Sequence, residues 1–130
     1  MRPLDLPPGA FLVAAVSDEW ESVRAELTRA FEFTKQAAQE GVPVVYVVRS
    51  EDLFGRRGAC PAMIACGLLS AARTAGIEGL KSGWSVNILA VDEGVVDGEV
   101  ERWAARLTEG GGPTGELVRL GGSHLGRLQP

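Results

Sequence analysis

A run of five large, mostly β-branched residues limits the possible folds of this chain more than any other feature. It comprises Val44, Val45, Tyr46, Val47 and Val48, and it shows no alternation between apolar and polar positions. β-branched residues favour extended backbone, and a strand without alternation is typical of a parallel sheet that is covered on both faces. The run therefore predicts a central strand with helices packed on both sides.

The segments around this run alternate between strand and helix patterns. Further strands are expected at residues 10–16, 84–91 and 116–120, and helices at residues 18–40, 62–77 and 97–108. Strands that alternate with helices predict an α/β fold with right-handed crossovers between parallel strands. We therefore expect one α/β domain over residues 1–130, with a parallel sheet of about four strands and helices on both faces.

Local signals indicate where several elements begin and end. Order is expected to start at residue 10, because the preceding segment contains Pro3, Pro7, Pro8 and Gly9. Asp18, with Glu21 three residues later, resembles a capping box for the first helix, which should end at Gly41. Trp20, Phe31 and Trp103 fit apolar helix stripes and are expected in the core, whereas the environment of Trp84 stays open.

The composition excludes several classes of function. Hydrophobic residues make up 45% and charged residues 23% of the 130 residues, as in ordinary globular domains. A net charge of -4 without a basic block disfavours a nucleic acid partner. Residues 10–16 are too short to cross a bilayer and residues 1–9 lack the layout of a signal peptide, so a cytoplasmic protein is expected.

The cysteines and the histidine do not suggest a metal site. Cys60 and Cys66 are six residues apart, which fits neither a CxxC redox pair nor half of a zinc site, and both are expected to be buried free thiols. His124 is the only histidine. It is expected at the surface or in an interface, because a metal site needs several converging ligands.

Four stretches of the chain are similar to sequence motifs of one enzyme family. They are residues 20–38, with Leu-Thr-Arg-Ala-Phe and Thr-Lys-Gln-Ala-Ala; residues 44–50, a strand ending in serine; residues 86–90, Val-Asn-Ile-Leu-Ala; and residues 114–122, Thr-Gly-Glu-Leu-Val-Arg-Leu-Gly-Gly. In this order they resemble the second half of the short-chain dehydrogenase/reductase (SDR) family across nearly the whole chain. The resemblance implies a single truncated, Rossmann-like domain over residues 1–130.

The resemblance implies positions for the family's catalytic asparagine, serine, tyrosine and lysine. They fall at Glu26, Ser50, Pro61 and Ala65, respectively. A prolyl ring has no proton to give and a methyl group has no charge, so the proton transfer coupled to hydride transfer has neither acid nor base. We therefore expect no dehydrogenase activity, with Ser50 as a vestige.

The resemblance also implies that the family's cofactor-binding half is missing, because the chain starts at about the fourth strand of the family's plan. Residues 110–115 match G-x-G-x-x-G, but they follow a helix and lead into a strand, so they are expected to form a loop. The Pro-Gly that borders the nicotinamide in the family is here Val91-Asp92. We expect no cofactor, NAD(H) and NADP(H) included.

The resemblance implies that this chain keeps the surface through which family members assemble. In the family, the helices equivalent to residues 18–40 and 62–77 form a four-helix bundle between subunits, and the last strand and tail form a second contact. The expected function is thus a non-catalytic subunit in oligomer assembly, with a catalytic SDR subunit as partner or, next, a second copy. Leu69 and Ala72 are expected in the contact, and residues 10–16 would leave an open sheet edge.

Two other functions stay open. A ligand-binding protein or enzyme could reuse the old cleft, for example for an acyl-CoA, through Glu26, Ser50 or Arg56. Simpler roles for these residues are a solvated helix glutamate, a turn serine and, with Arg57, an exposed arginine pair. A decayed gene product is the third possibility, and the intact helix caps, periodicity and turn glycines count against it.

Overall fold

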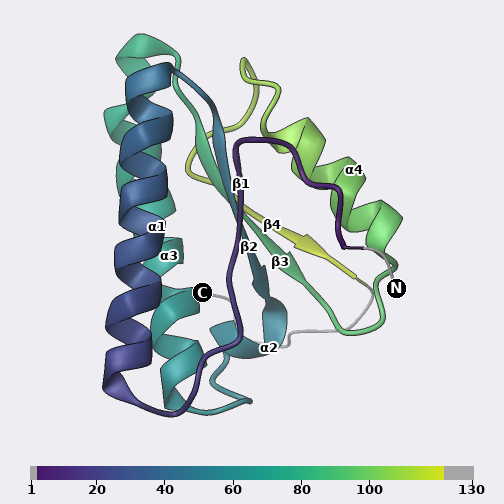
Figure 1. Cartoon of the computed structure of the whole chain (residues 1–130). Helices are drawn as coiled ribbons and strands as arrows, with labels where there is room; N and C mark the ends of the chain where they lie inside the picture. The colour runs from purple at the N-terminus through teal and green to yellow at the C-terminus, as the bar shows by residue number, and fades with distance from the viewer. Residues whose placement is uncertain (1–2, 122–130) are drawn as a thin grey trace.

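A computed structural model describes residues 3–121 of the chain. Within these residues, strands and long helices alternate, which confirms the predicted α/β class (Figure 1). The elements are β1 (Ala10–Leu12), α1 (Trp20–Glu40), β2 (Val44–Arg49), α2 (Ser50–Leu53), α3 (Ala59–Glu78), the 3₁₀ turn η1 (Leu80–Ser82), β3 (Val86–Val91), α4 (Asp97–Leu107) and β4 (Leu117–Leu120).

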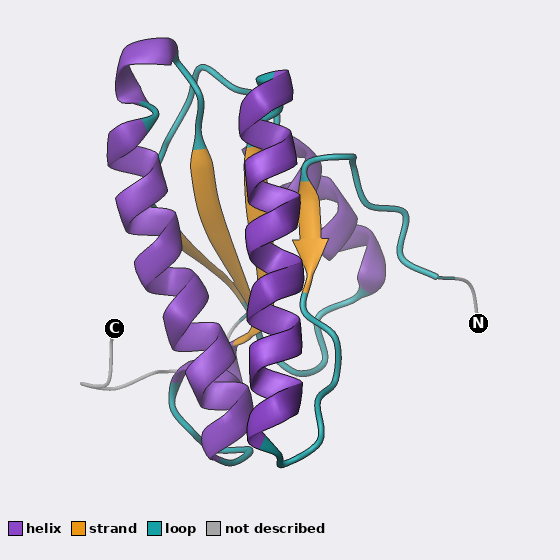
Figure 2. Cartoon of the chain, turned by 60° about the vertical axis from the view of Figure 1, so that its left-hand side comes forward, coloured by secondary structure: helices purple, strands orange, loops and turns teal. Residues whose placement is uncertain are grey.

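The four strands form one parallel sheet in the order β1-β2-β3-β4. β2 and β3 lie at its centre and pair from Val44 opposite Val86 to Arg49 opposite Val91. α1 and α3 cover one face of the sheet, and α4 covers the other (Figures 1 and 2). The Rossmann-like parallel sheet with helices on both faces, and the central place of the run at residues 44–48, are therefore confirmed.

Successive residues of the central strands point into two separate cores. Tyr46 and Ile88 belong to the core under α1 and α3, together with Val23 and Leu68. Val47 faces α4 instead, in a smaller core that also contains Val45, Leu89, Val100, Ala104 and Leu107. Side chains of one strand alternate between the two faces of a sheet, so a strand buried on both faces is mostly apolar along its whole length.

One connection departs from the prediction of right-handed crossovers. The strand order follows the chain order, so every connection moves in the same direction across the sheet. The hand of each crossover therefore depends only on the face of the sheet on which its helix lies. The connections through α1 and α3 are right-handed, and the connection through α4 is left-handed (Figure 1). Left-handed crossovers are rare. This one provides the only long helix within residues 3–121 that covers the second face.

The N-terminal segment differs from the prediction in two ways. The strand expected at residues 10–16 ends at Leu12, although Val13 still donates a backbone hydrogen bond to the Val47 carbonyl. The segment before it also has a defined path. Leu4 and Leu6 pack against the core under α4, and the Asp5 N–H donates to a Glu101 carboxylate oxygen at 2.6 Å. Apolar side chains between the prolines anchor this segment without regular structure.

The outer edge of β1 is open, as predicted, but it is short and partly blocked. β1 pairs only with β2, and Ala10 and Leu12 direct their backbone groups away from the sheet. The Ala10 N–H donates to the Pro7 carbonyl, and the Leu12 carbonyl accepts from the Arg29 guanidinium at 2.9 Å. A three-residue edge with two of its groups satisfied is a poor template for another strand.

The first helix ends at the predicted residue, but the predicted N-terminal cap is not formed. Gly41 terminates α1 in the left-handed conformation, with φ of 71°. The helix begins at Trp20 after Glu19, and no side chain caps its N-terminus, so the Asp18 capping box is wrong. Two core assignments on this helix are also wrong, because Trp20 is 57% and Phe31 is 63% exposed. Both lie at the edge of the stripe that Val23 and Ala30 bury.

The other tryptophans have defined partners. Trp103 packs against the core under α4, as predicted. Trp84 is half-buried beside the larger core, and its indole N–H donates to the Val42 carbonyl at 2.7 Å. This hydrogen bond ties the chain before β3 to the chain before β2.

A buried amide holds the last strand in place. Asn87 on β3 is fully buried, donates to the Pro113 carbonyl at 2.8 Å, and accepts from the Glu116 N–H at 3.1 Å. Residues 110–115 form the loop between α4 and β4, as predicted, and the loop passes so close to Gly76 of α3 that a Cβ there would lie 2.6 Å from the Gly115 nitrogen. The glycines of this loop serve packing and turns.

We predict that Asn87→Ala destabilises the fold by about 2–4 kcal/mol, because it removes both hydrogen bonds and leaves a small cavity. Urea denaturation measures the change. Gln39→Ala, at an exposed position on α1, is the control and should change stability by less than about 0.5 kcal/mol. A loss below about 1 kcal/mol for Asn87→Ala would show that the amide does not hold the loop.

Candidate functional site

Glu26, at the position of the family's asparagine, is a buried structural carboxylate. It accepts from the Ala14 N–H at 2.7 Å, and its two oxygens accept from the Arg29 guanidinium at 2.7 and 2.8 Å. Arg29 also donates to the Leu12 carbonyl and lies over the Phe11 ring, 4.2 Å from its centroid. These contacts fasten the segment after β1 to α1. The solvated role expected for Glu26 is therefore wrong.

The hydrogen bonds of Glu26 outweigh its burial. Burial alone raises the pKa of the carboxyl, but the hydrogen bonds from Arg29 and Ala14 and the charge of Arg29 hold the pKa of Glu26 below its ordinary value. The same hydrogen bond raises the pKa of Arg29. Glu26 thus stays ionised near neutral pH and is occupied by its own protein partners.

Ser50 does not meet Glu26. It is the first residue of α2, a short helix that the sequence did not predict, rather than part of a turn. Its side chain is buried, and its hydroxyl has no hydrogen-bond partner within residues 3–121. The two residues therefore do not form a joint site.

The positions of the family's tyrosine and lysine lie near the start of α3. Pro61 is half-buried, and Ala65 is buried against the core beneath α1 and α3. The only tyrosine, Tyr46, is buried in the same core and shares a hydrogen bond of 2.7 Å with the Thr34 hydroxyl, and burial raises its pKa.

Arg56 and Arg57 point to different partners. Arg57 donates from two nitrogens to the buried carboxylate of Asp52, at 2.8 and 3.1 Å. Arg56 is exposed and lies over the Phe54 ring. Residues 55–58 form a loop in which both arginines are exposed, as expected, and Arg57 is in addition held in an ion pair with Asp52.

The thiols are less buried than predicted. Cys66 is exposed and Cys60 is half-buried, and both are free. A hydrogen bond to Asp18 raises the pKa of Cys60. Within residues 3–121 no group of three or more metal-ligating side chains gathers, and His124 and most of the predicted tail contact at residues 121–130 lie outside the described residues.

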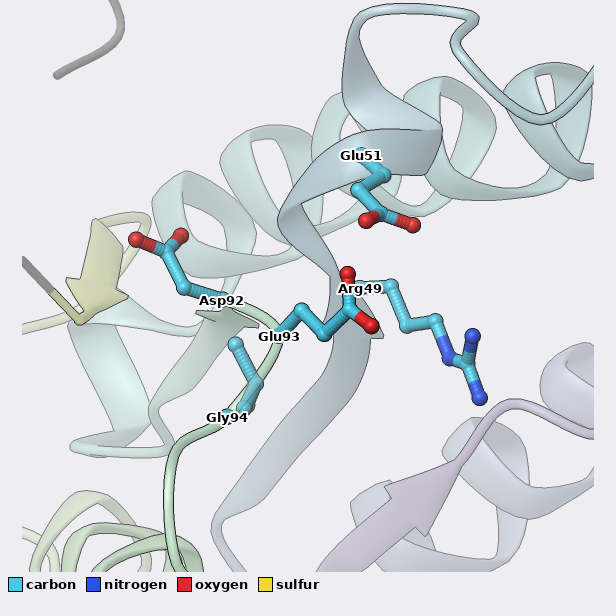
Figure 3. Close-up of a pocket in the computed structure, with 6 residues that line it drawn as sticks. Arg49, Glu51, Asp92, Glu93 and Gly94 are labelled. Atoms are coloured by element: carbon cyan, nitrogen blue, oxygen red, sulfur yellow. The ribbon is translucent and has the colours of Figure 1, made fainter. Parts of the chain in front are cut away.

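Two adjoining hollows lie at the carboxyl ends of the central strands. The first, of about 260 Å³, lies between the ends of β2 and β3 and is lined by Arg49, Glu51, Asp92 and Glu93, with Val91 and Gly94 (Figure 3). The second, of about 360 Å³, shares Arg49 and Val91 and is mostly apolar. We refer to the two together as the strand-end cleft. Our sequence reasoning missed Arg49, Glu51 and Glu93, although each closely follows a predicted strand, where ligands of parallel sheets bind.

A second candidate surface lies on the outside of α1 and α3. Its exposed, uncharged residues lie on neighbouring stripes of the two helices and are Phe31, Ala38, Met63, Gly67, Ser70, Thr74 and Ile77. We refer to them as the α1–α3 surface. Arg73 and Glu78 are the only charged residues of α3. A groove of about 450 Å³ lies between the two helices, with Tyr46 and Leu68 among the residues that line it. Figure 2 shows the two helices side by side in front of the sheet.

Two residues expected in this surface are not in it. Leu69 is 5% exposed and Ala72 is fully buried, so both face the protein's own core. α3 is also long and apolar enough to cross a membrane by length and composition. A core helix passes the same test, and α3 buries Ile64, Leu68 and Ala72 against the sheet.

No family model matches this chain, and no curated protein matches it.

We predict that Glu26→Gln lowers stability at pH 7 by about 1–2 kcal/mol, because it removes the charge that holds Arg29 while keeping an acceptor for Ala14. The folded-state pKa of Glu26 lies below the ordinary value of 4.5, so its contribution is present above about pH 4.5 and is lost as the pH falls through the folded-state pKa. The difference between the two proteins should therefore shrink in acid.

Urea denaturation at pH 7 and near pH 3.5 measures this difference. Glu21→Gln is the matched control, since Glu21 forms an ion pair of the same spacing with Arg24 but both side chains are exposed. It should change stability little at either pH. A difference for Glu26→Gln that is equal at both pH values would contradict the role of its charge.

Proposed function

We propose that this chain is a non-catalytic, SDR-like subunit that acts in oligomer assembly, in the cytoplasm, with a catalytic SDR subunit as its partner. The single observation that carries the proposal is the α1–α3 surface. Its helices match the pair that the resemblance assigns to contacts between subunits.

The chemistry of this surface favours a protein partner. Seven of its residues are exposed and uncharged, and Phe31 and Ile77 are 63% and 70% exposed. Exposed apolar residues that gather in one place typically mark an interaction site. Gly67, Ser70 and Thr74 carry small side chains, which allow a partner helix to approach α3 closely.

A helix pair from a partner would have room to bury enough area. Stable interfaces bury about 800 Å² on each side, and aromatic residues seated in pockets contribute most of the binding energy. Phe31 stands at the lip of the groove, and the groove itself offers about 450 Å³ to a partner side chain. Lys35 and Glu78 line the groove as well and can form polar contacts at the rim.

The substitutions at the family's catalytic positions support the non-catalytic part of the proposal. Ala65 packs in the core, so a lysine at this position would need to bury its charge, which costs several kcal/mol. Pro61 offers no ionisable group, and Glu26 is committed to Arg29 and Ala14. Proton transfer in the family's manner has no residue to perform it.

The acyl-CoA alternative has less support. Its several phosphates would need several free cations, but Arg57 is neutralised by Asp52, which leaves Arg49 as the one unpaired arginine that lines the strand-end cleft within the described residues. The strand-end cleft carries more carboxylates than guanidinium groups. Like charges repel, so this cleft disfavours a polyanion.

We predict that Gly67→Arg disrupts the assembly while preserving the fold. A Cβ at Gly67 meets only the Leu27 side chain, at 3.6 Å, and replacing glycine within a helix favours the helix by up to about 1 kcal/mol. The arginine side chain would place an unpaired charge in the contact, which costs several kcal/mol when buried. Light scattering should give an assembly larger than 13.7 kDa for the wild type and a monomer for the variant.

The control is Gln39→Arg, which adds the same side chain to α1 at an exposed position outside the groove. It should assemble like the wild type, and circular dichroism should show both variants folded. A wild type that is a monodisperse 13.7 kDa monomer would overturn the proposal, and an oligomer unchanged by Gly67→Arg would exclude the α1–α3 surface as the contact.

A further inference from the structure

We propose that the strand-end cleft binds a free α-amino acid with an aliphatic side chain. In this arrangement Arg49 holds the carboxylate of the ligand, Glu93 and Glu51 hold its ammonium group, and the apolar hollow takes its side chain. The inference goes beyond the assembly function and does not depend on it.

The first argument is the position of the cleft in the fold. After β2 the chain turns to the face covered by α3, and after β3 it turns to the face covered by α4 (Figure 1). The two connections separate at neighbouring strands and leave an opening between Arg49 and Asp92. In parallel α/β sheets, ligands bind at the carboxyl ends of the strands where the connections diverge in this way.

The second argument is an arginine without an ion pair. Arg49 is the last residue of β2, is exposed, and lines both hollows. Within residues 3–121, the arginines at 29, 57 and 119 are all paired with buried carboxylates, whereas Arg49 forms no salt bridge. A guanidinium group binds a carboxylate with two parallel hydrogen bonds, so Arg49 is suited to the acid group of a ligand.

The third argument is the state of the carboxylates around Arg49. Asp92 is buried and paired with Arg119 at 2.9 Å, and Asp52 is paired with Arg57. Glu93 has no ion pair within the described residues. Glu51 has one long ion pair, with 4.0 Å between its carboxylate oxygen and the Arg57 guanidinium. Figure 3 shows Glu51 and Glu93 extending into the space between β2 and β3, with Asp92 turned away from them. Carboxylates placed together favour a cation between them, such as an ammonium group.

The fourth argument is the apolar wall beside Arg49. The second hollow is lined by aliphatic side chains from three directions: from the end of β1 and the residue after it, from β2, and from α4 and the loop before it. They are Leu12, Val13, Val47, Val95 and Val100. Its volume of about 360 Å³ lies at the lower end of the range of small-molecule sites. A cation, carboxylates and an aliphatic wall in one cleft match the three parts of an aliphatic amino acid.

Isothermal titration calorimetry of the full chain with L-leucine tests the proposal. 4-Methylpentanoate lacks the ammonium group and 3-methylbutylamine lacks the carboxylate, so each should bind at least about tenfold more weakly, as expected for loss of one charged contact. Arg49→Gln and Glu93→Gln should each weaken L-leucine binding by about tenfold or more. Arg24→Gln, at an exposed arginine of α1, should leave it unchanged.

The outcomes separate this proposal from the assembly function. Gly67→Arg, on the α1–α3 surface, should bind L-leucine like the wild type even where it dissociates the assembly. No heat of binding at millimolar L-leucine would overturn the proposal. Equal binding of L-leucine and 4-methylpentanoate, or binding that survives both Arg49→Gln and Glu93→Gln, would overturn it as well.

Discussion

Burial of β2 and β3 on both faces is the constraint on which the rest of this structure depends. A parallel strand with apolar side chains on both of its faces needs helices on both sides of the sheet. The chain meets this need by sending α1 and α3 to one face and α4 to the other, at the cost of a rare left-handed crossover. The same change of face opens the strand-end cleft between β2 and β3. Asn87 then secures β4, because its buried amide bonds the loop that leads into that strand.

Much of the fold could be predicted because its signals are local. The apolar run at residues 44–48 indicates a doubly buried strand, and Gly41 marks a helix end through its left-handed backbone. The inner face of α3 could not be predicted, because a helix that is apolar almost all round has no periodicity to distinguish its sides. For this reason Leu69 and Ala72 were placed outside, although both are buried. The hand of the last crossover likewise depends on how the whole sheet is covered.

The candidate site was harder to predict than the fold, because its residues act through partners that are distant in the sequence. Glu26 binds the Ala14 N–H, and its partner Arg29 binds the Leu12 carbonyl. No spacing rule indicates these two contacts with the end of β1 and the residues after it. Arg49 and Glu93 are ordinary charged residues until the parallel register brings the ends of β2 and β3 together. The resemblance to the SDR family directed attention to Ser50, whose hydroxyl is buried, and away from its exposed neighbour Arg49. Exposed groups at strand ends would have been the better guide.

We propose, from the α1–α3 surface and from the residues at the family's catalytic positions, that the role of this chain is to complete another subunit. The mass of the intact complex, isolated from the cells that produce this chain, tests that account most directly. We predict a complex in which the 13.7 kDa chain is bound to a larger subunit that carries all of the oxidoreductase activity. A lysine-reactive cross-linker should join that subunit to this chain through Lys35 in the groove. A mass equal to the single chain, or oxidoreductase turnover by the isolated chain, would contradict it.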